Sequence, residues 1–177
     1  MTKSWPSVQE AVKAFIGIRK EIGSPEDSFS CIQFSSNAVA SFTQLRMETA
    51  LKQASKLTLR GGGTHFSPAL QAVSGLVQPG QQVAILFMTD GASTDAQPTK
   101  ENPHPPPYDP IPDVQSIMGK GAQISFFGVA FTPQGKTKIF QDIVQSSQGV
   151  LIEAANVKEL RDQFQSIAQN PTAAHAK

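Results

Sequence analysis

Two short segments of the chain carry side chains that suit a hard divalent cation. Residues 61–64 (Gly-Gly-Gly-Thr) place the hydroxyl of Thr64 at the end of a glycine-rich loop that enters a predicted helix. Residues 87–91 (Phe-Met-Thr-Asp-Gly) place the carboxylate of Asp90 at the end of an apolar strand. Both positions would share one edge of an α/β sheet, and magnesium prefers hydroxyl and carboxylate oxygens. The pattern is compatible with a cation site at that edge, but also with an ordinary turn in which Thr64 caps the backbone and Asp90 and Gly91 end the strand.

Length and composition are those of one ordinary globular domain. A chain of 177 residues can bury a full core, and its net charge of +1 gives no electrostatic case for a nucleic acid or an anionic membrane. No apolar run approaches the roughly 20 residues that cross a bilayer, and the polar N-terminus is no signal-peptide core. The single cysteine, Cys31, fits a reducing compartment. We therefore expect a cytoplasmic protein without membrane insertion and without a nucleic-acid partner.

Helical and strand patterns alternate along the chain. Residues 83–88 and 124–131 are uninterrupted apolar runs, which is typical of strands buried on both faces of a mostly parallel sheet. Residues 28–34 and 38–42 have the spacing of an antiparallel hairpin. Helices are predicted near residues 5–22, 47–57, 67–76, 113–118, 139–145 and 157–170, with Ser67 and Asn156 as N-caps. The pattern predicts an α/β fold in which a doubly wound, mostly parallel sheet has helices on both faces and one antiparallel edge hairpin.

A proline-rich loop, residues 97–112, interrupts this alternation within a single domain of residues 1–170; residues 171–177 are expected to be a disordered tail. The loop leaves the strand of residues 83–88, so it should project from the same edge as Asp90. Pro105, Pro106 and Tyr108 match the Pro-Pro-x-Tyr pattern that WW domains bind. Tyr108 is expected to be exposed, and a WW-domain ligand is one alternative function.

Four segments in order resemble the von Willebrand factor type A domain. Residues 61–64 with the following helix look like the family's second metal motif, and residues 86–91 look like its third. Residues 27–35 are similar to its second strand, and residues 149–154 with the closing helix resemble its last strand and helix. The resemblance covers nearly the whole chain and implies a Rossmann-like fold.

In that family a divalent cation, usually magnesium, is held at a metal-ion-dependent adhesion site and completed by an acidic side chain of the partner. The resemblance implies that Thr64 and Asp90 are metal ligands, that Mg²⁺ or Mn²⁺ is the cofactor, and that the partner is a protein presenting Asp or Glu. It further implies a protein-interaction domain of the adhesion or scaffolding type rather than an enzyme.

The family's first motif, Asp-x-Ser-x-Ser at the end of a central first strand, has no counterpart, because the predicted first helix begins near Trp5. We therefore expect an N-terminally incomplete domain, which begins at an internal methionine or is a cloned fragment. Loss of that strand would leave two rows of unpaired backbone groups. The prediction is weak or absent metal binding and a chain that is poorly folded or that oligomerises by borrowing a strand.

An enzyme that binds a nucleotide or phosphate is the remaining alternative. A glycine run before a helix can cradle a phosphate. However, Phe66 stands where a dinucleotide fingerprint needs glycine, and there is no Gly-Lys-Ser/Thr loop. The histidines, His65, His104 and His175, have no zinc-ligand spacing. The sequence therefore disfavours catalysis.

Overall fold

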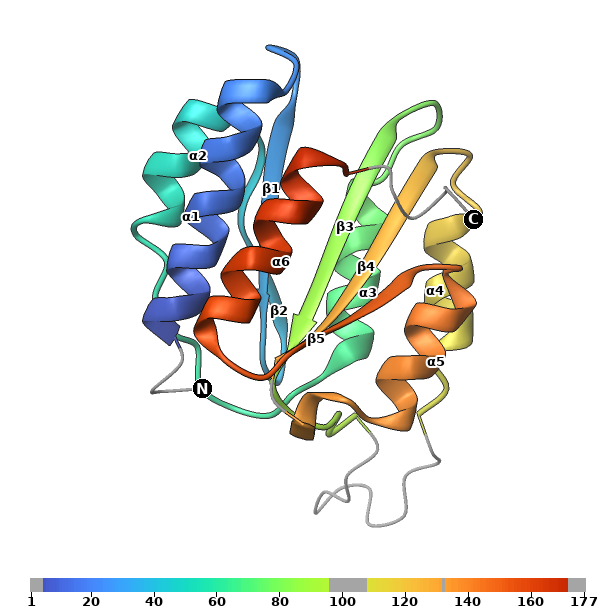
Figure 1. The fold of residues 1–177 in the computed structure, drawn as a ribbon. Coiled ribbons are helices and arrows are strands. Elements are labelled where there is room, and N and C mark those ends of the chain that lie inside the picture. Colours follow the sequence, from blue (N-terminus) through green and yellow to red (C-terminus); the bar gives the residue numbers. More distant parts are fainter. Residues whose placement is uncertain (1–4, 96–107, 132, 172–177) are drawn as a thin grey trace.

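The computed structural model describes residues 5–95, 108–131 and 133–171, and in these the helices and strands alternate as predicted. Figure 1 shows the strands as a central layer with helices on both faces. The elements are α1 (Trp5–Ile22), β1 (Ser28–Phe34), β2 (Ala38–Arg46), α2 (Met47–Ala54), α3 (Phe66–Leu76), β3 (Gln82–Thr89), α4 (Ile111–Met118), β4 (Gln123–Phe131), a 3₁₀ turn η1 (Pro133–Gly135), α5 (Lys138–Ser146), β5 (Val150–Ala154) and α6 (Val157–Gln169). The predicted α/β class is confirmed.

The strands form two separate sheets. β1 and β2 pair antiparallel, which confirms the predicted hairpin, and β3, β4 and β5 pair in parallel in that order. β1 and β3 are not hydrogen-bonded neighbours, so the doubly wound sheet is split between them. None of the described strands lies between β1 and β3.

The core has one cluster on each face of the strands. One cluster joins β4 to α1, α2 and α6, and the other joins β3 and β4 to α3, α4 and α5. Phe127 and Val129 of β4 belong to the first cluster, whereas Ile124 and Phe126 belong to the second. Successive side chains of a strand point to opposite faces, so a continuous apolar run can serve both clusters.

Two predicted helix starts have different outcomes. Asn156 caps α6 as expected: its side chain accepts a hydrogen bond from the Glu159 backbone N–H at 3.0 Å, and Glu159 Oε2 accepts one from the Ala155 N–H at 2.8 Å. The prediction of Ser67 as the N-cap of α3 is wrong. The helix already begins at Phe66, with His65 at the N-cap position and no capping bond from the His65 side chain.

The helices do not include a candidate membrane span. In the described part of the chain, no helix combines the length and the apolar character that crossing a bilayer requires. Residues 97–107 of the predicted proline-rich loop and residues 172–177 of the predicted tail lie outside the described residues. The predictions for those two segments therefore stay predictions.

Candidate functional site

The glycine-rich loop lies at the end of the sheets where β1 and β3 both finish. The backbone N–H of His65 donates to the carbonyl of Ser35, directly after β1, at 2.8 Å. The backbone N–H of Gly63 donates to Ser36 Oγ at 2.9 Å. These bonds fix the loop to the end of β1, and we call this end of the sheets the carboxyl rim. Ser36 was not among the residues that the sequence singled out.

The same loop is tied to the segment that follows β3. The Thr64 N–H donates to Thr94 Oγ1 and the Thr94 N–H donates to the Thr64 carbonyl, both at 2.8 Å. Thr64 Oγ1 would lie only 3.4 Å from a Cβ atom placed on Gly91, the residue after Asp90. Thr64 and the half-buried Asp90 also line the same cavity. The fold therefore brings together the two residues that the sequence proposed as ligands.

Two positions of the glycine-rich loop can hold only glycine, one because of its backbone conformation and one because of a neighbouring side chain. Gly62 has a φ of +123°, a left-handed conformation that disfavours other residues. A Cβ atom on Gly63 would lie 2.7 Å from Thr94 Oγ1, which is too close for any real side chain. The glycine run therefore lets the loop pass close to the segments on both sides of it, and this packing places Thr64.

A second carboxylate at the rim, Asp95, serves the backbone of α3. Its Oδ2 accepts a hydrogen bond from the Phe66 N–H at 2.7 Å, and its Oδ1 accepts one from the Ser67 N–H at 3.2 Å. The hydroxyl of Ser93 donates to Asp95 Oδ2 at 2.5 Å. Asp95 thus caps α3 from the loop after β3, the role that the sequence assigned to Ser67. The only feature of the sequence that could have pointed to Asp95 is the run Ser-Thr-Asp at residues 93–95, shortly after Asp90 ends the strand.

Tyr108 was predicted to be exposed, but its side chain is half-buried. The side chain packs against the α3–α5 cluster, and its hydroxyl donates to Asp113 Oδ2 at 3.0 Å. Burial, and then the hydrogen bond to Asp113, raise the pKa of Tyr108 well above its ordinary value. A WW domain would have to extract this side chain. Pro105 and Pro106 lie outside the described residues, so no observation favours the WW alternative.

The donor chemistry fits a hard cation that keeps most of its water. Among the residues that the structure describes, no group of three or more His, Cys, Asp or Glu side chains could hold a metal. At the rim the carboxylate of Asp90 lines the same cavity as the hydroxyl of Thr64, and Asp95 accepts hydrogen bonds from the α3 backbone. Magnesium accepts one or two protein oxygens and several waters, whereas zinc sites are most often built from cysteine sulfur and histidine nitrogen.

A sequence profile of the von Willebrand factor type A domain matches residues 1–93, and the chain belongs to this family. Domains of this family are generally protein-interaction or adhesion modules. No curated protein sequence matches the chain. The family assignment agrees with the order of elements and with the position of the glycine-rich loop.

Solved structures share the fold. Proximal thread matrix protein 1 from the mussel byssus has a TM-score of 0.66 and 18% identity, over 97% of this chain and 43% of its own. A von Willebrand factor type A structure from Catenulispora acidiphila has a TM-score of 0.66 and 16% identity, over 94% and 38%. BatB from Bacteroides thetaiotaomicron has a TM-score of 0.63 and 15% identity, over 96% and 87%. At these identities the likeness shows the fold alone.

The matched structures differ from this chain in length and come from proteins of different kinds. The chain spans less than half of the mussel protein's length. One structure of that protein is described as having a zinc-occupied MIDAS motif, at 16% identity to this chain. Another match, at 14% identity, is an aerotolerance-related membrane protein from Bacteroides fragilis. The fold therefore does not test the cytoplasmic location that the sequence predicts.

Proposed function

We propose that this domain binds an acidic side chain of a protein partner through a divalent cation, Mg²⁺ or Mn²⁺, held by Thr64 and Asp90. The observation that carries the proposal is the approach of the Thr64 hydroxyl to Gly91, directly after Asp90, where a Cβ atom would lie 3.4 Å from Thr64 Oγ1. The reciprocal Thr64–Thr94 hydrogen bonds hold that arrangement in place. Membership of a family of interaction domains supports the same reading.

Each residue has a distinct part in this function. Asp90 supplies the negative charge that attracts the cation, and Thr64 supplies a neutral oxygen beside it. Asp95 neutralises the N-terminus of α3 and is thereby kept from competing for the cation. When bound, the cation supplies the positive charge that a partner carboxylate completes. Two protein ligands hold a cation weakly, so the partner carboxylate adds a large share of the binding.

Calorimetric titration of the chain with MnCl₂ and MgCl₂ tests the site. The expected dissociation constant is about 1 mM or weaker, because only two side chains bind. Thr64→Val and Asp90→Asn should each abolish the binding heat. The matched controls are Thr43→Val on β2 and Asp162→Asn on α6, which are exposed positions outside the rim and should leave the binding unchanged. Micromolar Mg²⁺ affinity, or binding that survives both rim substitutions, would contradict the assignment.

The partner chemistry has its own test. A short peptide with one central glutamate should bind the chain in the presence of Mn²⁺ and lose binding when EDTA is added. The same peptide with glutamine in place of glutamate should not bind under either condition. Equal binding of both peptides, or binding that persists in EDTA, would contradict the proposal that the cation bridges the domain and the partner carboxylate.

A further inference from the structure

The carboxyl rim carries cationic side chains on both sides of Asp90. On the β4 side, a Cβ atom placed on Gly135 would lie 2.6 Å from the carbonyl oxygen of Thr89, the residue before Asp90. Lys136 follows directly in that segment. On the β1 side lies the loop that leads to α3, and it carries Arg60. The two cations therefore flank the candidate cation site along the rim.

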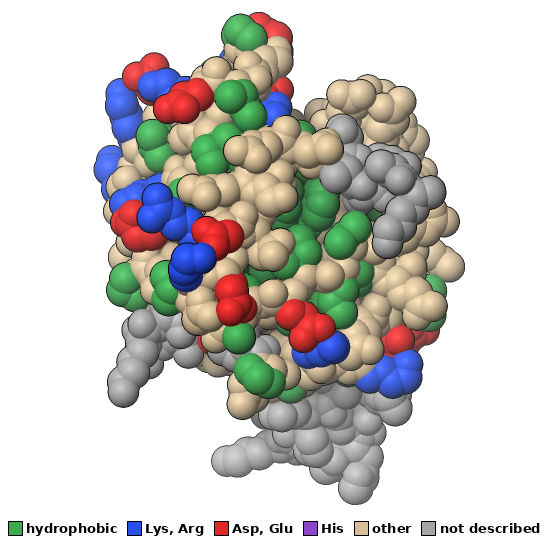
Figure 2. Space-filling model, viewed as in Figure 1, with side chains coloured by type: hydrophobic (Ala, Val, Ile, Leu, Met, Phe, Trp, Pro, Cys, Tyr) green, Lys and Arg blue, Asp and Glu red, His purple; other side chains and the backbone are tan. Residues whose placement is uncertain are grey.

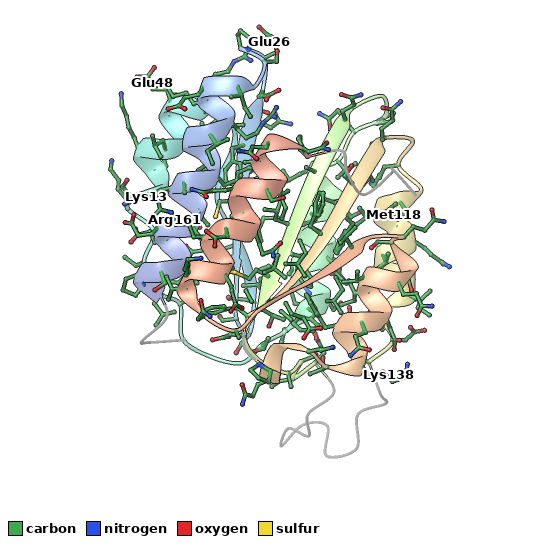
Figure 3. The ribbon with its side chains drawn as sticks, viewed as in Figure 1. Lys13, Glu26, Glu48, Met118, Lys138 and Arg161 are labelled. Carbon is green, nitrogen blue, oxygen red and sulfur yellow. The ribbon has the colours of Figure 1, made fainter. Side chains whose placement is uncertain are left out.

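The lysines on the β4 side already have carboxylate partners. Lys136 Nζ donates to Glu153 Oε1 of β5 at 2.5 Å. Lys138, which Figure 3 labels at the start of α5, donates to both carboxylate oxygens of Asp142 at 2.8 and 2.9 Å. A carboxylate of a binding partner would have to compete with these partners. The β4 side of the rim is therefore a poor place for a second acidic group.

Arg60 differs from the two lysines. Its side chain is exposed, and no hydrogen bond or ion pair joins it to another residue in the described part of the chain. Of the carboxylates near the rim, Asp95 accepts from the α3 backbone and Glu153 accepts from Lys136. Arg60 lines the same cavity as Thr64. Its guanidinium is therefore available to a group that approaches the rim.

The backbone around Arg60 is anchored at the end of β1. Gln33 Nε2 donates to the Thr58 carbonyl at 2.8 Å, two residues before Arg60. Gly63, three residues after Arg60, donates its backbone N–H to the side chain that follows β1 at 2.9 Å. The four-residue step from Arg60 to Thr64 spans at most about 14 Å. The long side chain of Arg60 can thus reach a ligand bound at Thr64.

The charge balance at the rim calls for more than one anion. A divalent cation beside the carboxylate of Asp90 leaves net positive charge, and Arg60 adds to it. One partner carboxylate that completes the ligands of the cation does not neutralise all of this charge. A guanidinium binds a carboxylate through two parallel N–H···O bonds, whereas magnesium takes individual oxygen ligands. The rim therefore suits two carboxylates a short distance apart.

We propose that the partner presents two acidic side chains, one that completes the cation held by Thr64 and Asp90 and a second that pairs with Arg60. This inference rests on the proposed function of the cation site. In an extended peptide the two acidic residues are two to four positions apart, about 7–13 Å, which matches the span of the loop from Arg60 to Thr64. The second acidic residue lies on the β1 side of the first.

A pair of peptides tests the second acidic group. One peptide has two glutamates three positions apart, and the other has glutamine in place of the second glutamate. In the presence of Mn²⁺ and at low ionic strength, the second glutamate should tighten binding about three- to five-fold, measured by fluorescence anisotropy. Salt at about 0.5 M should remove most of this difference, because an exposed ion pair is screened.

Substitutions at Arg60 test the residue itself. Arg60→Gln should abolish the difference between the two peptides and leave the affinity for the single-glutamate peptide nearly unchanged. Arg60→Lys should keep part of the difference, because an ammonium group lacks the two-pronged contact. The matched control is Lys20→Gln, an exposed cation in the last turn of α1, which should keep the full difference. Circular dichroism of each variant checks that it folds.

A charge exchange gives a positive result rather than a loss. The Arg60→Glu chain should prefer a peptide with lysine at the second position over the peptide with two glutamates, the reverse of the order for the unmodified chain. Both peptides are compared on the same chain, so a change in cation affinity affects them equally.

The outcomes separate this inference from the proposed function. Suppose that the single-glutamate peptide binds only with Mn²⁺, but the second glutamate adds nothing or its effect survives Arg60→Gln. The role of Arg60 would then be overturned while the cation site stands. If neither peptide shows binding that depends on Mn²⁺, the cation site itself is contradicted, and the partner with two carboxylates is contradicted with it.

Discussion

β4 and β3 are neighbouring strands of similar apolar sequence, yet they are buried to different extents. From Ile124 to Phe131 all residues of β4 are buried, with Phe127 at 3% and Val129 at 0% exposed. In β3, buried Ile85 and Phe87 alternate with the part-exposed Leu86 and the part-exposed Met88. The difference is that β4 is paired on both edges whereas β3 is paired on one. Apolar sequence marks a strand as central, but a neighbour on each side is what buries it.

β1 is affected in the same way, because among the described strands it pairs with β2 only. Six of its seven residues are only partly buried, although Phe29, Cys31 and Phe34 all pack against core clusters. Figure 2 shows hydrophobic side chains in the middle of the viewed face, over the parallel strands, with charged side chains toward the margins. The cavity of about 940 Å³ between β1 and β3 therefore has apolar walls that the helices α1, α3 and α6 do not fill.

Two phenylalanine truncations provide the largest contrast. Phe127→Ala should lower the free energy of unfolding by about 3–5 kcal/mol, because the ring is fully enclosed. Phe29→Ala should cost about 2 kcal/mol, because the ring is part-exposed even though it lies 5.9 Å from the Phe15 ring and 6.0 Å from the Phe42 ring. Urea unfolding followed by circular dichroism measures both. Equal costs for the two phenylalanine variants would mean that β1 is as enclosed as β4, which would break the comparison.

The pH dependence of stability reports on Cys31. Burial raises the pKa of this thiol from its ordinary 9.0 to about 11. Above about pH 9 the unfolded chain loses the proton first, so the folded state loses stability as the pH rises toward 11. The chain should lose about 1–2 kcal/mol relative to Cys31→Ala between pH 8.5 and pH 11. Parallel stability profiles for the two proteins would show that the thiol is not desolvated.

The carboxyl rim is held by side-chain bonds to the backbone rather than by strand pairing. Asp95→Ala removes both acceptors from the first turn of α3 and should cost about 0.5–2 kcal/mol. Asp95→Asn keeps one acceptor and should cost less. Asp162→Ala on α6 is the surface control and should change stability by less than about 0.5 kcal/mol. If the three variants unfold at the same urea concentration, Asp95 does not cap α3.

The parts of the fold that were predicted correctly are those set by local pattern. The continuous apolar runs located β3 and β4, and the Asn156–Glu159 pair located the start of α6. Thr64 and Asp90 were placed on one rim because the ends of parallel strands share an edge. Membership of the family is also confirmed. The roles of Thr64 and Asp90 as ligands stay predictions.

The parts that the sequence missed depend on contacts between distant residues. Asp95 caps a helix that starts 29 residues earlier, and no local pattern announces such a bond. Ser67 has the preferred type for a cap, but Asp95 satisfies the same backbone groups and the helix begins one residue earlier. Tyr108 follows a run of prolines that suggested exposure, whereas its contact with Asp113 draws it against the core.

The most direct test of the open edges is hydrogen exchange of the backbone amides, followed strand by strand. In β4 every amide of residues 124–131 should be protected. In β3 about half of the amides should exchange rapidly, because alternate residues direct their N–H toward the edge that does not pair with β4. Uniform protection along β3 would contradict the account, because both of its edges would then already be paired.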